Sequence, residues 1–93
     1  MNSGPLISIG IISYNNSSHI SECIESCLSQ TYKNTEIIIA DDGSTDNSVQ
    51  IIEKYARLYS SKITLISSQK NCGTAINFNK AVKASKGEWF KPI

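Results

Sequence analysis

The sequence predicts an α/β fold in which helices cover both faces of a mostly parallel sheet. Two observations lead to this prediction: short β-branched segments alternate with segments of helical periodicity, and turn-forming residues separate them. The expected order along the chain is β-α-β-α-β-α-β. Because right-handed crossovers join successive parallel strands, this order indicates a three-layer α/β/α arrangement. A chain of 93 residues has room for one domain at most.

The first strand is expected at residues 6–12, which are almost all apolar and mostly β-branched. Such a run is typical of a strand covered on both faces of a parallel sheet. A polar loop follows, and Ser18 is a suitable N-cap for the next helix. The apolar residues of that helix recur at the spacing of a single helical face: Ile20, Cys23, Ile24, Cys27 and Leu28.

The second strand is expected at residues 36–40, where three consecutive isoleucines indicate burial on both faces. A polar turn at residues 41–46 leads into the second helix, which Thr45 or Asp46 can cap. Asp46 is interpreted mainly as an anion that complements the dipole at the start of this helix. The buried face of the helix is predicted to comprise Val49, Ile52, Ala56 and Tyr59.

A third, shorter strand is expected at residues 63–66, and a loop at residues 69–73. The third helix is predicted at residues 75–85, with Gly87 as the left-handed residue after its end. Its apolar face is predicted to comprise Ala75, Phe78, Ala81 and Val82. A fourth strand begins at residues 88–90, and its uncovered outer edge predicts dimerisation by strand pairing.

The composition excludes several classes of function. Nine basic and eight acidic residues give a formal charge of +1, and the lysines are scattered. No nucleic-acid partner is expected, because such a partner requires clustered basic residues. Three cysteines without a repeated spacing do not indicate a disulfide framework, and reduced cysteines favour the cytoplasm. No apolar run is long enough to span a bilayer, although membrane association of a longer protein is compatible with this sequence.

Polar residues follow the strands at the edge where open parallel sheets bind ligands. Ser13, Tyr14 and Asn15 come after the first strand, and residues 67–73 come after the third. A dinucleotide site would need glycines after the first strand, yet no glycine occurs between Gly10 and Gly43. An aromatic side chain at Tyr14 suits the wall of a base or ribose site better.

The adjacent carboxylates of Asp41 and Asp42 are the sharpest feature of this edge. Because successive side chains of a strand alternate, one should face the ligand cleft and the other a loop or helix cap. A carboxylate in the cleft can accept hydrogen bonds from a uracil or ribose, each contributing about 1.5–3 kcal/mol. Turn chemistry alone, with no ligand, remains an alternative explanation for this stretch.

These segments, taken in order, resemble family 2 glycosyltransferases. Residues 8–15 are similar to a first strand that ends in Thr/Ser-Tyr-Asn, and residues 26–32 to the family's Ser-x-Leu-x-Gln-Thr-Tyr segment. Residues 36–46 resemble its acidic strand end and turn. Later blocks of the family match Asn71, Gly73, Asn79, Gly87, Glu88 and Trp89. The resemblance extends over almost the whole chain.

The resemblance implies a Rossmann-like nucleotide-binding fold of the GT-A type with sheet order 3-2-1-4. It implies transfer of a sugar from a nucleotide-diphosphate donor, usually a UDP-sugar, to a hydroxyl acceptor in polysaccharide or cell-surface glycan synthesis, with inversion. By the same resemblance, Asp42 meets the uracil or ribose and Asp41 braces the loop. The remaining nucleotide-binding residues implied are Ser13, Tyr14, Asn15, Asn71 and Gly73.

Two departures from the family accompany this resemblance. Ile12 stands where relatives commonly have proline, and Ile76, Asn77 and Phe78 provide no basic residue where many relatives have one. The family also implies a divalent metal, Mg or Mn, whose Asp-x-Asp ligands and catalytic base are expected beyond Ile93. Residues 1–93 are therefore expected to form a truncated nucleotide-sugar-binding half that is inactive alone. A non-catalytic nucleotide-binding remnant or module is the alternative.

Overall fold

The computed structural model describes residues 4–93 as a four-stranded parallel sheet with three helices. Its strands are β1 (Ile7–Ser13), β2 (Thr35–Asp41), β3 (Ile63–Ser67) and β4 (Trp89–Pro92). Its helices are α1 (Ile20–Leu28), α2 (Ser48–Leu58) and α3 (Thr74–Ala84). The strand order is β3-β2-β1-β4, so both the predicted element order and the predicted sheet order are confirmed.

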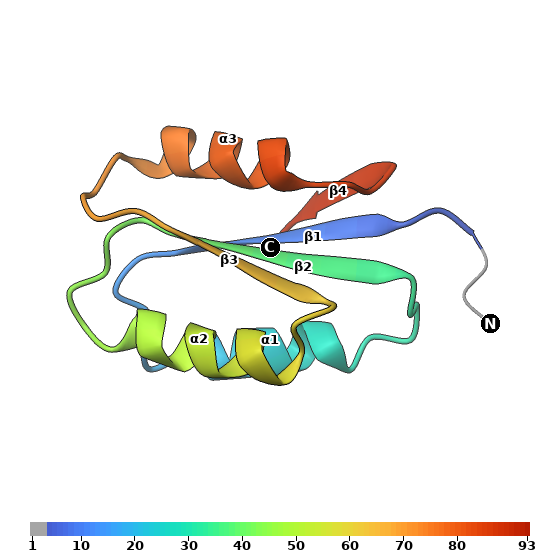
Figure 1. Cartoon of the computed structure of the whole chain (residues 1–93), viewed down its shortest axis with the longest axis horizontal. Helices are drawn as coiled ribbons and strands as arrows, with labels where there is room; N and C mark the ends of the chain where they lie inside the picture. Colours follow the sequence, from blue (N-terminus) through green and yellow to red (C-terminus); the bar gives the residue numbers. More distant parts are fainter. Residues whose placement is uncertain (1–3) are drawn as a thin grey trace.

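The helices form a layer on each side of the sheet. In Figure 1, α1 and α2 lie on one face and α3 lies on the other. Both faces of β1 and β2 are therefore covered, which explains why these strands are apolar without alternation. Within residues 4–93, no helix has the length and apolar character needed to cross a membrane.

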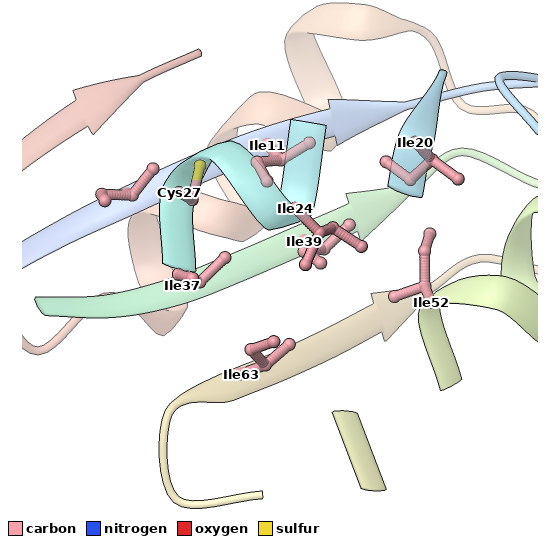
Figure 2. Packing of buried hydrophobic residues seen from close by; sticks show 9 residues of the cluster. Ile11, Ile20, Ile24, Cys27, Ile37, Ile39, Ile52 and Ile63 are labelled. Atoms are coloured by element: carbon pink, nitrogen blue, oxygen red, sulfur yellow. The ribbon is translucent and has the colours of Figure 1, made fainter. Parts of the chain in front are cut away.

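The larger core lies between the sheet and the pair α1 and α2. Figure 2 shows side chains from both helices meeting side chains of β1, β2 and β3 in this layer. Its buried members are Ile9, Ile11, Ile20, Ile24, Cys27, Ile37, Ile39, Ile52 and Ile63. Cys27 thus acts as a core residue, and burial raises the pKa of its thiol.

The smaller core lies beneath α3. Ile38 and Ala40 of β2 pack there against Ala81, while Phe90 of β4 makes an edge-to-face contact with Phe78 at a centroid distance of 5.6 Å. Gly10 of β1 makes room for this ring, because a Cβ atom there would overlap Phe90. The contact joins the edge strand β4 to α3.

The start of α1 differs from the prediction. The N-cap is His19, and no side chain in the described part of the chain caps this helix. The Asn16 carbonyl instead accepts the N–H groups of His19 and Ile20, at 3.0 and 2.9 Å. Ser18 is therefore not the cap, because a backbone turn and a neighbouring loop already satisfy this helix start.

The third helix also differs from the prediction. Ala75 and Val82 are exposed, whereas Asn77 is fully buried and its Nδ2 donates to the Ala40 carbonyl at 2.7 Å. The buried face of α3 therefore includes Asn77 in place of Ala75 and Val82. A search for periodic apolar residues could not identify it, because Asn77 is polar. Gly87 does not follow the helix as a left-handed residue, since the helix ends at Ala84 with Ser85 as its cap.

Gly87 is required instead by a close approach between two backbones. A Cβ atom there would lie 2.7 Å from both the Leu6 carbonyl oxygen and the Ser8 nitrogen. The Gly87 N–H donates to Ser8 Oγ at 2.8 Å, and Ser8 donates to Glu36. This small network holds the beginning of β4 against β1.

Candidate functional site: the carboxyl edge of the sheet

Three loops converge where β1, β2 and β3 end. In the sheet register Ser13 pairs with Asp41, and Asp41 pairs with Ser67. The Asp42 N–H donates to the Ser13 carbonyl at 2.9 Å, and the Ser68 N–H donates to the Asp41 carbonyl at 3.0 Å. The segments predicted to share this edge of the sheet therefore lie side by side.

Tyr14 and Asp42 directly follow the paired residues Ser13 and Asp41, so each is the first residue after the end of one of two neighbouring strands. Tyr14 is 49% exposed and thus has an accessible ring face. Ser13 is fully buried, and its hydroxyl has no hydrogen-bond partner among the described residues. Of the three residues at the end of β1 that were predicted to bind nucleotide, Tyr14 has an exposed aromatic ring and Ser13 has no exposed surface.

Asp41 closes the turn that follows β2. Its Oδ2 accepts the Ser44 N–H at 2.9 Å, and its Oδ1 accepts the Ser44 hydroxyl at 2.6 Å. The side chain is fully buried. Asp41 therefore holds the loop in shape and has no surface to offer a ligand.

Asp42 points to the opposite side of the sheet, as strand alternation requires, and reaches the segment before α3. Its Oδ1 accepts the Cys72 N–H at 2.7 Å, and its Oδ2 accepts the Gly73 N–H at 3.0 Å. The carboxylate is only 4% exposed and lies at the positive end of the α3 dipole. Each oxygen accepts one hydrogen bond from the described residues, so the carboxylate has acceptor capacity beyond these two bonds.

Glycines allow the two loops around Asp42 to approach one another. Gly43 has φ +77°, and a Cβ atom there would lie 2.8 Å from the Lys70 carbonyl carbon. Gly73 has φ +97° and open space around the missing Cβ position, so its backbone conformation alone favours glycine. Asn71, between these contacts, is exposed at the rim. The loop before α3 thus borders Asp42.

Asn15 has a different role from the one its position predicted. Its φ of +47° turns the side chain toward the loop after β2, where Oδ1 accepts the N–H groups of Thr45 and Asp46 at 2.8 and 3.3 Å. Its own N–H donates to Ser44 Oγ at 2.8 Å. Asn15 therefore links two loops, and its amide oxygen is used within the protein.

Asp46 completes the connection between these loops. Its Oδ2 accepts the Ser17 N–H at 3.1 Å, and its Oδ1 accepts the N–H and hydroxyl of Ser48 at 2.9 and 2.6 Å. Ser48 Oγ accepts the Asn16 N–H at 2.9 Å in turn. The hydrogen bond from the Ser48 side chain is the main cause that lowers the pKa of Asp46 from 3.8 to about 2.

Lys80 is a residue near this edge that the sequence analysis did not consider. Its Nζ donates to Ser68 Oγ at 2.7 Å and so carries a positive charge to the loop after β3. Residues 76–78 of the same helix have no basic side chain, as noted from the sequence. Lys80 lies four residues after Ile76, one helical turn along α3, and this spacing is the signal that could have identified it.

A metal ion does not fit the residues assembled here. Within residues 4–93, no three His, Cys, Asp or Glu side chains come together as a metal site. Asp41, Asp42 and Asp46 each accept hydrogen bonds from loop donors, and they point to different parts of the edge. The chemistry that this edge offers is therefore recognition by one aromatic ring, one carboxylate and loop backbone.

Comparison with known proteins agrees with this geometry. Residues 8–91 match the family described as glycosyl transferase family 2. EpsE of Bacillus subtilis (strain 168) is 42% identical over 89 residues, which is 96% of this chain and 32% of EpsE. The glycosyltransferase GlyG of Streptococcus pneumoniae is 37% identical over 84 residues, which is 90% of this chain and 28% of GlyG.

Solved structures share the fold. A TarS structure from S. aureus, in complex with UDP-GlcNAc, superposes with a TM-score of 0.82 at 27% identity, over 94% of this chain and 25% of that one. A mannosyltransferase from Pyrobaculum calidifontis, in complex with GDP-Man and Mn²⁺, superposes with a TM-score of 0.84 at 24% identity. The match covers 92% of this chain and 26% of the mannosyltransferase chain. The chain spans less than a third of the length of these relatives and matches the N-terminal part of GT-A structures. With this fold and a family match over residues 8–91, the chain belongs to glycosyl transferase family 2.

Proposed function

We propose that this chain is the donor-nucleotide-binding part of an enzyme that transfers a sugar from a UDP-sugar to a hydroxyl acceptor. One observation carries the proposal: the pairing of Ser13 with Asp41 brings Tyr14 and Asp42 together at the carboxyl edge of the sheet. This is the edge at which open α/β sheets bind ligands. An aromatic face and a carboxylate at that edge suit a nucleoside.

In the proposed complex, the Tyr14 ring lies against the base. The free lone pairs of Asp42 accept a hydrogen bond from the base N–H or from a ribose hydroxyl. The loop from Asn71 to Gly73 borders the donor, and Asn15 and Asp41 act by holding the loops. The N3–H of uracil is one donor that this carboxylate can accept, and the structure of TarS with UDP-GlcNAc, at 27% identity, supports the choice of a uridine donor.

We further propose that these 93 residues bind the nucleotide without transferring the sugar. A divalent metal, when bound in a complete enzyme, neutralises diphosphate charge and assists the leaving group. The acidic side chains at this edge are instead engaged with loop amides. Asp41 is fully buried, Asp42 is assigned to the nucleoside and Asp46 accepts three donors from neighbouring loops, so we propose none of them as the general base for the acceptor hydroxyl.

A titration with UDP, followed by backbone amide shifts, tests donor binding. The amides of Tyr14 and Asp42 should respond, and the response should be lost in Asp42→Ala. Glu53→Gln is the matched control, because it removes one negative charge from an exposed position on α2. If a folded sample shows no response at saturating UDP, the proposed function is wrong.

The same sample tests the second part of the proposal. Incubation with UDP-GlcNAc, Mn²⁺ and a hydroxyl acceptor should release no UDP above the rate measured without protein. Turnover that depends on the protein would contradict the assignment of this chain to binding alone. Donor binding in the absence of turnover is the combination expected.

A further inference from the structure

Tyr14 has its backbone held on both sides. On one side is Ser13, the last residue of β1, which pairs with Asp41. On the other side is Asn15, in a left-handed conformation that is uncommon for a residue other than glycine. The direction of the half-exposed Tyr14 ring therefore depends on what keeps Asn15 in place.

Asn15 is kept in place by the loop that follows β2. Its side-chain oxygen accepts two backbone N–H groups of that loop, from Thr45 and Asp46. Its N–H donates to Ser44 Oγ. A displacement of residues 44–46 would break all three bonds and release Asn15 from its left-handed conformation.

Residues 44–46 are in turn secured at Ser44 by Asp41, and at their other end by the side chain of Asp46. One carboxylate oxygen accepts the Ser17 N–H, and the other accepts two donors from Ser48, the first residue of α2. Ser48 Oγ also accepts the Asn16 N–H, so a second bond crosses between the loops. All three of these bonds run to the loop after β1 or to the start of α2, so the Asp46 side chain joins the two loops.

We propose that Asp46 is a positioning residue for the nucleoside: it ties the loops after β1 and β2 together and so holds the Tyr14 ring against the base. The inference rests on the proposed function and adds a residue to it. Asp46 lies on a different loop from Tyr14 and contacts the residues that follow it. Asp42, on the other face of the sheet, is held separately by Cys72 and Gly73.

This separation gives a test in which the two halves of the site respond differently. UDP is titrated into the unaltered 93-residue protein and into Asp46→Ala, while the amides of Tyr14 and Asp42 and the nuclear Overhauser contacts between Tyr14 and uracil protons are recorded. Asp46→Ala should weaken UDP binding about tenfold, since base stacking supplies affinity of this order. The Tyr14 contacts should disappear while the Asp42 amide still responds.

Two further variants keep the test decisive if Asp46→Ala does not fold. Asp46→Asn retains one acceptor oxygen and should give an intermediate loss, and Ser48→Ala removes the hydroxyl that joins Asp46 to Asn16. Glu53→Gln, which changes the charge alone, should bind as the unaltered protein does. Partial rescue by asparagine would support a role through hydrogen bonding.

The outcomes separate the two proposals. If the folded, unaltered protein does not bind UDP, the proposed function fails and the inference fails with it. If the unaltered protein binds UDP but the Asp46 variants lose the Tyr14 and Asp42 responses in parallel, or lose neither, the positioning role is overturned while donor binding stands. Selective loss at Tyr14 supports the inference.

Discussion

Asp41, Asp42 and Asp46 each use a carboxylate to bind backbone N–H groups of a nearby or distant loop. Asp41 binds the amide of Ser44, and Asp42 binds those of Cys72 and Gly73. Hydrogen bonds to a charged acceptor are stronger than neutral ones, so these side chains define the shape of the edge. In the proposed complex, Asp42 therefore meets the nucleoside through a side chain that is already oriented.

The charge of Asp46 should make stability depend on pH. Its pKa in the folded protein is lowered from 3.8 to about 2. A lowered pKa means that the ionised form stabilises the folded state above about pH 4, and that this contribution is lost as the pH falls toward 2. In urea unfolding, Asp46→Asn should have a lower free energy of unfolding than the unaltered protein at pH 7, and this difference should become smaller near pH 2.

Glu53→Gln provides the control for this pH series, because Glu53 is exposed on α2 and the substitution removes one negative charge there. The free energy of unfolding of Glu53→Gln should stay close to that of the unaltered protein at both pH 7 and pH 2. If the free energies of unfolding of Asp46→Asn and the unaltered protein differ by the same amount at pH 7 and pH 2, the ionised form of Asp46 does not stabilise the fold.

Residue roles at the edge were only partly predictable from the sequence. The alternation rule correctly places Asp41 and Asp42 on opposite sides of the sheet. The hydrogen-bond partners of Asp42 are Cys72 and Gly73, which lie 30 and 31 residues further along the chain, so no local sequence pattern predicts them. The sequence likewise does not predict that the Asn15 side-chain oxygen accepts a hydrogen bond from the Thr45 N–H.

At the scale of elements, continuous burial made the strands easy to predict, while the helix ends were decided by tertiary contacts. Runs of β-branched residues identified β1 and β2 because both of their faces are covered. The start of α1 was mispredicted because a carboxylate from another loop binds the Ser17 N–H. The buried face of α3 was mispredicted because Asn77, a polar residue, occupies it.

The attachment of β4 gives a prediction about a single element. Gly87→Ala should destabilise the fold by about 1–3 kcal/mol, the usual cost of forcing extra volume into a packed site. The new Cβ would press on the backbone of Leu6 and Ser8, which cannot move aside as a flexible side chain can. Chemical denaturation at pH 7 measures the loss.

Lys86→Ala is the matched control for that substitution, since its side chain is exposed and only its backbone N–H takes part in the network. It should change the free energy of unfolding by less than about 0.5 kcal/mol. If Gly87→Ala is as mild as Lys86→Ala, the close approach of the two backbones is not a constraint on β4.

At the scale of the whole molecule, the sheet has a free edge. Among residues 4–93, β4 pairs with β1 on one side and has no strand on the other. Trp89 is 66% exposed and Ile93 is 54% exposed along this part of the chain. Lys91 and Pro92 oppose strand addition, because charge and a missing N–H both discourage pairing at an edge.

We predict that these opposing features give a weak dimer of the 93-residue protein, formed by antiparallel pairing of two β4 strands. Sedimentation at increasing concentration should show the mass rising toward twice the monomer, and Trp89→Glu should abolish the rise. Leu58→Glu, on the exposed side of α2, should leave it unchanged. A mass that stays monomeric at every concentration would contradict strand pairing.

The alignment of β1 with β2 has a practical meaning for anyone who wishes to re-engineer donor choice. A slip of one position between these strands would invert every side chain on the strand that moved and would carry Tyr14 and Asp42 apart. Under the proposed function, insertions or deletions in either strand should abolish nucleotide selectivity, whereas point changes at Tyr14 or in the loop at residues 71–73 should alter it. Engineering of this site should therefore keep the lengths of β1 and β2 unchanged and substitute individual side chains.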